Sequence, residues 1–269
     1  MLNEEQGYKE NQNDFDEINN NIEKMGFYSI PPEKKQAEDD KEKLPFYVKL
    51  IIFACGFAFG GYYLLQYIWV LIITKGDLDN ITPAQEVGVI SACYFTLFAI
   101  SLFFIIKYRK YFAAKLKDPT KYLQGLIFGL VTVGIEMAVS MIMNSILPAD
   151  TNANQQAIMD YTNCYPILMF FVTVFIGPLC EEMTYRVGLF EAIKEKNETA
   201  ALIATSLIFA VIHISFSNTT IEAELNALPV YITIGFCLTY AYKKHGLACS
   251  YVAHVFLNLL SFLSILTQM

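Results

Sequence analysis

Seven long apolar runs follow one another along most of the chain. They span residues 46–73, 87–107, 123–147, 165–193, 198–216, 227–243 and 246–267. A helix needs about 20 mainly apolar residues to cross the hydrocarbon core of a bilayer, and we expect each run to do so. None of them shows the alternation of apolar and polar positions that a membrane β-barrel strand requires. The pattern therefore predicts an all-α membrane bundle of about seven transmembrane helices.

Basic residues in the connections alternate between the two ends of these predicted helices. Five lysines precede or open the first run, six basic residues lie in the second connection, and two lysines lie in each of the fourth and sixth. The first connection has only Lys75, and the third, the fifth and the C-terminus have none. Because positively charged loops stay in the cytoplasm, we predict a cytoplasmic N-terminus and a C-terminus outside.

Most of the net charge belongs to the first 44 residues. They contain twelve Asp or Glu and six Lys, which gives −6 of the formal −7 of the whole chain. This stretch has no sustained apolar period and predicts a disordered acidic cytoplasmic tail before a transmembrane domain at 45–269. The nearly neutral remainder argues against nucleic acid as a partner. The first apolar run begins too late for a cleavable signal peptide.

Composition adds two points. The chain is 55% hydrophobic, above the share usual for soluble domains, and the excess is concentrated in the seven runs. Its six cysteines form no C-x-x-C pair, so we interpret each as a small buried apolar residue.

A few polar groups interrupt the apolar runs, and they cluster at similar depth. Ionisable groups inside a bilayer are costly and normally mark function or a buried pair. Counting 1.5 Å per residue from the predicted cytoplasmic ends places the polar groups of three runs roughly 15–21 Å deep. These groups are Glu181 in the fourth run, His213 in the fifth, and His254 and Asn258 in the seventh. Glu136 lies alone in the third run, roughly 20 Å deep on the same count. Glu182, Arg186 and Phe209 are further residues of the fourth and fifth runs close to them in sequence.

Helical spacing separates the roles of the two adjacent glutamates. Glu182 and Arg186 are four residues apart and share a helix face, as do His254 and Asn258. Glu181 points about 100° away from Glu182 around the helix. We therefore expect one carboxylate to face a cavity while its neighbour pairs with Arg186.

These motifs resemble those of the CAAX-protease and bacteriocin-processing (Abi) family of intramembrane endopeptidases. Glu-Glu-x-x-x-Arg at 181–186, Phe-x-x-x-His at 209–213 and His-x-x-x-Asn at 254–258 match its three motifs in order, and the resemblance covers about residues 120–267. It implies hydrolysis of a peptide bond within the membrane. Glu181 would act as general base on a water with the help of His213, and His254 and Asn258 would stabilise the oxyanion.

An alternative makes Glu181, His213 and His254 ligands of a catalytic zinc ion. The ligand types suit zinc, but the chain lacks an H-E-x-x-H helix, and the carboxylate would lose its role as base. We favour the metal-free chemistry, with no cofactor. Arg186 with Glu182 is expected to be a structural ion pair, and Phe209 to pack beside the site. Glu136 could pair with Arg186 or with a histidine, or only make a helix contact.

The resemblance implies a substrate that is a membrane-associated peptide or protein, such as a prenylated CAAX protein or a bacteriocin or signalling-peptide precursor; self-immunity to a bacteriocin is a related role. Membrane lipid would surround a multi-pass protein, and the simple tail favours a bacterial plasma membrane. A non-proteolytic scaffold that regulates a partner such as a sensor kinase is the main alternative. A proton-coupled transporter would require inverted repeats, which we do not detect. Serine and aspartate intramembrane proteases are excluded because G-x-S-x-G and G-x-G-D are absent.

Overall fold

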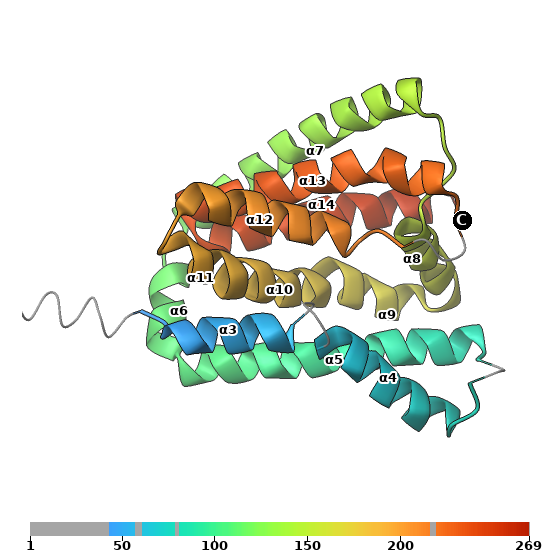
Figure 1. Cartoon of the computed structure of the whole chain (residues 1–269), viewed down its shortest axis with the longest axis horizontal. Helices are drawn as coiled ribbons and strands as arrows, with labels where there is room; N and C mark the ends of the chain where they lie inside the picture. The colour runs from blue at the N-terminus through green and yellow to red at the C-terminus, as the bar shows by residue number, and fades with distance from the viewer. Residues whose placement is uncertain (1–42, 57–60, 79–80, 216–218, 269) are drawn as a thin grey trace, which may run out of the picture. The chain divides into compact units, whose positions relative to one another are not determined.

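A computed structural model describes residues 43–56, 61–78, 81–215 and 219–268. Five helical stretches in these residues are long and apolar enough to cross a membrane: α5 (Pro83–Lys107), α7 (Thr120–Ile146), Pro166–Lys194, α13 (Ile221–His245) and α14 (Leu247–Leu266). Shorter helices are α3 (Phe46–Cys55), α4 (Gly61–Thr74), α6 (Arg109–Leu116), α8 (Ala153–Cys164) and α12 (Glu198–Val211) (Figure 1).

The all-α membrane bundle expected from the sequence is confirmed, and the described residues contain no strand. The count of seven spans and the sidedness of the termini stay predictions. So does the disordered tail at 1–44, of which only Lys43 and Leu44 lie among the described residues.

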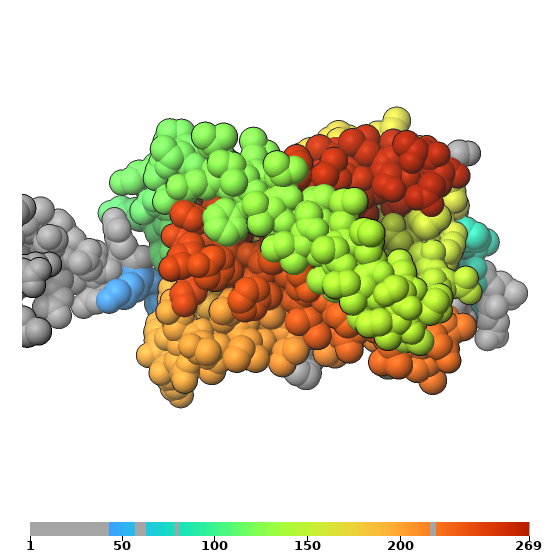
Figure 2. Space-filling model, turned by 90° about the horizontal axis from the view of Figure 1, so that it is seen from above, coloured from blue at the N-terminus to red at the C-terminus, as the bar shows by residue number. Residues whose placement is uncertain are grey.

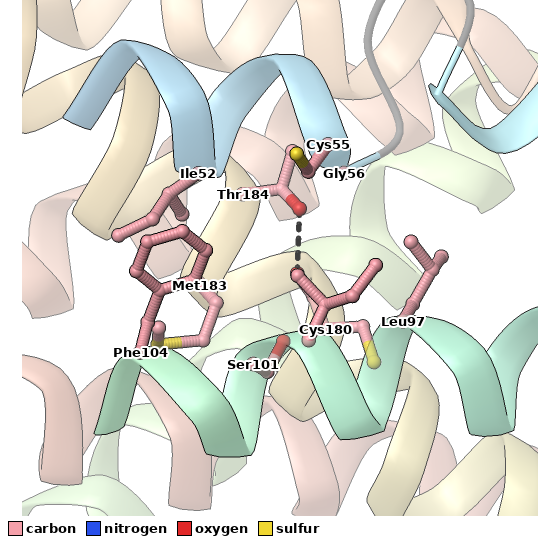
Figure 3. Close-up of a pocket in the computed structure, with 10 residues that line it drawn as sticks. Ile52, Cys55, Gly56, Leu97, Ser101, Phe104, Cys180, Met183 and Thr184 are labelled. Carbon is pink, nitrogen blue, oxygen red and sulfur yellow. Dashed lines mark hydrogen bonds between the residues drawn. The ribbon is translucent and has the colours of Figure 1, made fainter. Parts of the chain in front are cut away.

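The first apolar run is not one continuous helix, and that part of the sequence prediction is wrong. α3 ends at Cys55, and Gly56 leaves the helix with φ −82° and ψ −142°. A Cβ at Gly56 would lie 1.9 Å from Oγ1 of Thr184, so the backbone approaches this side chain as only glycine allows (Figure 3). Gly188 makes a second close contact, because its Cβ would lie 2.9 Å from the backbone nitrogen of Phe53. Hydrophobicity alone does not reveal this break.

The fourth run forms the centre of the bundle. In an apolar stretch of 18 residues within this run, 56% of the residues are buried, whereas 11% are buried in the corresponding stretch of α7. Two π-helical segments widen it, which is a feature often found at functional sites. Its consecutive parts are α9 (Pro166–Phe171), η1 (Val172–Ile176), α10 (Gly177–Glu181), η2 (Glu182–Phe190) and α11 (Glu191–Lys194). The second π segment begins between the two adjacent glutamates.

Connections that the sequence predicts to be cytoplasmic meet at one end of the bundle. Lys49 of α3 donates to the backbone oxygen of Glu191 at 3.2 Å, and Lys115 of α6 lies 3.9 Å from the Glu191 carboxylate. Burial lowers the pKa of Lys115, and the Glu191 carboxylate opposes this shift. At the end of α13, Lys243 pairs with Glu198 at 3.0 Å. Figure 1 shows the start of α3, α6 and the start of α12 together at this end.

α8 lies at the opposite end and was not predicted (Figure 1). Asn152 caps it by accepting a hydrogen bond from the backbone nitrogen of Gln155 at 2.9 Å. The buried Glu224 of α13 accepts another from the backbone nitrogen of Ala153 at 2.8 Å. Both bonds satisfy backbone N–H groups that have no partner within the first turn of α8. The bond to Glu224 also fixes α8 to α13.

α7 packs closely on α14 over half of its length and then diverges. A Cβ at Gly125 would lie 2.7 Å from the Cys249 carbonyl, and one at Gly129 would lie 2.9 Å from the Phe256 ring. At Gly134 nothing lies within 4 Å of an added Cβ. Figure 2 shows the later half of α7 lying apart from the later half of α14, with a hollow between them.

Candidate active site

A buried polar cluster links the middle of the fourth span to α14. Glu182 and Arg186 are both fully buried, with 3.1 Å between Oε1 and Nη1. The same Oε1 lies 3.0 Å from Nδ1 of His254. Arg186 also donates from Nη2 to the Gly235 carbonyl of α13 at 3.5 Å and lies over the Phe209 ring, 5.0 Å from its centroid. Glu182 thus pairs with Arg186 as the four-residue spacing predicts.

Glu181 is oriented differently from its neighbour. Its side chain is buried yet lines a large cavity, and its Oε2 lies 3.6 Å from Nε2 of His254. This oxygen has no hydrogen bond in the described part of the chain, although only 6% of the residue is exposed. A buried carboxylate oxygen without a partner is costly. It is therefore available to bind a water or a substrate.

His254 bridges the two glutamates through opposite ring nitrogens. Because the Glu182 carboxylate can only accept, Nδ1 of His254 must carry the proton in that contact. Nε2 consequently faces Glu181 and the cavity. The Glu182 contact fixes both the tautomer and the orientation of the ring.

His213 contributes a second imidazole from the turn that follows α12. Its Nδ1 lies 2.7 Å from the Phe209 carbonyl, so this nitrogen must donate and Nε2 remains free to accept. The His213 ring stacks on Tyr231 of α13, with 4.8 Å between centroids, and packs on Phe209 at 4.6 Å. The helix itself ends at Val211, short of the predicted run. Sequence reasoning missed Tyr231, because nothing distinguishes it from the other tyrosines of the chain.

Asn258 lies one turn beyond His254 on α14. Its Nδ2 donates to the backbone oxygen of Thr173 in η1 at 2.8 Å. An amide nitrogen carries two hydrogens, so one remains available to another acceptor. The η1 segment thereby orients the amide, a contact that the sequence did not indicate.

The cavity brings the polar residues of four helical regions together. Its volume is about 1300 Å³, and residues that line it include Glu136, Glu181, Phe209, His213, His254 and Asn258. Glu182 and Arg186 lie behind this lining, in the buried cluster. Glu136 is half-buried and has neither a hydrogen bond nor an ion pair among the described residues, so the expected pairing with Arg186 or a histidine is not found.

The zinc alternative was tested on the same geometry. Both imidazoles use Nδ1 for other contacts and keep Nε2 free, which is compatible with metal ligation. Nevertheless, no three His, Cys, Asp or Glu side chains in the described ranges gather closely enough to hold one metal ion. The residues as placed do not form the proposed ligand set, and we derive no step through a metal.

Comparison with known proteins identifies the region that holds these residues. Residues 163–260 match the model of the family described as type II CAAX prenyl endopeptidase Rce1-like. This part of the chain is similar to the Rce1-like family. The match contains Glu181, His213, His254 and Asn258, and it confirms the family expected from the three motifs.

Two curated relatives are similar to part of this chain. A protein of Mycoplasma capricolum subsp. capricolum (strain California kid), named "Uncharacterized protein", is 34% identical over 107 residues, which are 39% of this chain and 30% of that protein. "Putative membrane peptidase YdiL" of Bacillus subtilis (strain 168) is 34% identical over 92 residues, which are 34% of each chain. This chain thus spans about a third of the length of the relatives it matches. No solved structure matches it.

Proposed function

We propose that this protein is an intramembrane endopeptidase in which Glu181 activates a water molecule to hydrolyse a peptide bond. The observation that carries the proposal is the Glu181 carboxylate, which lines the cavity with one oxygen free of hydrogen bonds and 3.6 Å from His254. A general base must be within reach of the proton that it abstracts, and a water in the cavity that is hydrogen-bonded to the Glu181 carboxylate meets this condition. Similarity to the Rce1-like family supports the same reaction.

In the first step, Glu181 accepts a proton from the water, and the water oxygen forms a bond to the carbonyl carbon of the scissile peptide. His213 orients this water by accepting a hydrogen bond at Nε2, because its Nδ1 is committed to the Phe209 carbonyl. The carbonyl oxygen of the substrate becomes an oxyanion in the tetrahedral intermediate.

The oxyanion then requires donors that are already in place. Asn258 offers its second amide hydrogen, since the first is held by Thr173. His254 can donate from Nε2 once it has taken up a proton there from solvent before the reaction. Glu182, hydrogen-bonded to Nδ1, stabilises the cation, and this proton stays on the ring throughout the reaction. When the carbon–nitrogen bond breaks, the proton on Glu181 passes to the leaving amine. The products are a new carboxylate and a new amino terminus.

For the substrate, we propose a membrane-associated peptide or protein, either a prenylated CAAX protein or a bacteriocin or signalling-peptide precursor. The location proposed from the sequence, a bacterial plasma membrane, is supported by the bacterial origin of both relatives.

The test compares Glu181→Gln with the wild-type chain, both purified in detergent and incubated with libraries of internally quenched peptides. We expect cleavage to fall by at least about 10²-fold, the range typical for loss of a general base. Glu222→Gln is the matched control, because Glu222 is exposed at the start of α13 and does not line the cavity. If Glu181→Gln protein of native size and helicity cleaves as the wild type does, the enzymatic proposal is wrong.

Metal content decides between the two mechanisms. We expect cleavage to continue after treatment with a chelator and purified protein to hold less than stoichiometric zinc. Zinc bound one to one, and lost together with activity, would instead assign Glu181, His213 and His254 to a metal centre.

A further inference from the structure

The Asp, Glu, Lys and Arg residues that line the cavity all carry charge of one sign. Every Asp, Glu, Lys or Arg that lines it in the described part of the chain is acidic. These residues are Glu86, Glu136, Asp150, Asp160 and Glu181. Lys49, Lys115 and Lys243 lie instead at the other end of the bundle, around Glu191 and Glu198. A cleft of one charge sign with low-dielectric walls raises the local concentration of ligands of the other sign.

Glu136 occupies the least expected position in this lining. It lies in the second half of α7, and Ser140 and Asn144 follow it at helical spacing on the same side of the cavity. α7 diverges from α14 just before this stripe, beyond Gly129, and all three residues of the stripe line the cavity. A carboxylate in a membrane span normally pairs with a basic residue of the same protein. None of the described basic residues pairs with Glu136.

A second, independent observation points to a ligand in the same cavity. Glu181 lines the cavity and is only 6% exposed, and its buried Oε2 has no hydrogen-bond partner among the residues that the structure describes. Two carboxylates from different helices thus face one space, and no Lys or Arg of the described residues lines it. The lining also includes Asn144 and Asn226. Asn226 donates from Nδ2 to Asn144 Oδ1 and to the Leu147 carbonyl, which leaves Nδ2 of Asn144 and Oδ1 of Asn226 without a hydrogen bond among the described residues. This donor and this acceptor suit the backbone of an extended peptide.

We propose that the cavity selects a cationic peptide segment and that Glu136 is a specificity-determining residue, which pairs with a Lys or Arg side chain of the substrate near the scissile bond. The inference rests on the proposed function and adds the substrate class to it. The size of the cavity favours a peptide over an inorganic cation, because about 1300 Å³ and several amide side chains exceed what one ion needs.

The test uses binding as well as cleavage, so that the two proposals can fail separately. Fluorescent peptides identical except for one central Lys, Gln or Glu are titrated against full-length Glu181→Gln protein in nanodiscs. We expect the Lys peptide to bind roughly tenfold more tightly than the Gln peptide. Adding Glu136→Gln should bring this ratio close to one, and Glu136→Lys should favour the Glu peptide. Adding Glu222→Gln instead, at an exposed site away from the cavity, should leave the ratio unchanged.

In the cleavage arm, wild-type protein should show the same preference for the Lys peptide in kcat/KM, and Glu136→Gln should remove it. Charge-selective binding without cleavage would overturn the proposed function and leave the inference standing. Cleavage with equal affinity for the Lys and Gln peptides would overturn the inference alone. Stoichiometric binding of Ca²⁺ or Mg²⁺ that depends on Glu136, combined with equal peptide affinities, would identify an inorganic occupant and also overturn it.

Discussion

Replacing Glu182 by Gln should destabilise the protein strongly, although the side chain keeps its size. The Glu182 carboxylate is fully buried and lies 3.1 Å from Arg186 and 3.0 Å from His254. Its removal leaves the Arg186 charge buried without a counter-ion. Breaking a buried pair in this way costs about 3–5 kcal/mol. We expect a loss of this size in the free energy of unfolding, measured by titrating the purified protein with a denaturing detergent.

A double-mutant cycle isolates the pair from the rest of the cluster. Arg186→Met alone leaves the Glu182 carboxylate unbalanced, whereas the double variant removes both charges. The double variant should therefore lose less stability than the sum of the single ones, with a coupling of at least about 1 kcal/mol. Glu198→Gln is the matched control. The Glu198 side chain is 52% exposed and that of its partner Lys243 is 24% exposed, so this ion pair should contribute about 0–1 kcal/mol. Additive effects, or a Glu182→Gln loss no larger than that of the control, would refute the reasoning.

Two further predictions concern the orienting amide and the packing of α3. Asn258→Ala should lower kcat by about 10²–10³-fold because one oxyanion donor is lost, while the free energy of unfolding changes little. If kcat measured on a cleaved peptide is unchanged, Asn258 has no part in the mechanism. Gly188→Ala should cost about 1–3 kcal/mol of stability, because its Cβ would meet the backbone of Phe53 at 2.9 Å. Gly134→Ala is the control, because its added Cβ has no described atom within 4 Å, and it should stabilise α7 by up to about 1 kcal/mol. Equal effects of the two substitutions on stability would contradict the close contact between Gly188 and α3.

The sequence predicted the all-α membrane bundle and singled out residues that line one cavity, for a physical reason. Polar groups are so costly within apolar runs that Glu181, His213 and His254 stand out wherever they occur. Helical spacing then correctly paired Glu182 with Arg186 and separated Glu181 from both. The catalytic roles of these residues are still predictions.

What the sequence could not give depends on contacts between distant segments. The break after Cys55 follows from the close approach of Gly56 to Thr184, which lies 128 positions later and leaves no mark in a hydrophobic pattern. The helix α8 is polar and lies between two apolar runs, so the hydrophobic pattern does not predict it, yet it is fixed by a buried carboxylate of α13. The π segments likewise arise where the central span must satisfy several neighbours at once.

Adjacent carboxylates in the middle of a membrane span would repel each other if both remained unbalanced. Here the conflict is resolved by giving Arg186 and Nδ1 of His254 to Glu182 alone. Glu181 then keeps its charge for the cavity, where its nearest basic group is the far nitrogen of the same histidine. A substitution at Arg186 should therefore also change the site. The uncompensated Glu182 would take the Nδ1 proton of His254, and the neutral Nε2–H that remains is a weaker donor to the oxyanion than the imidazolium.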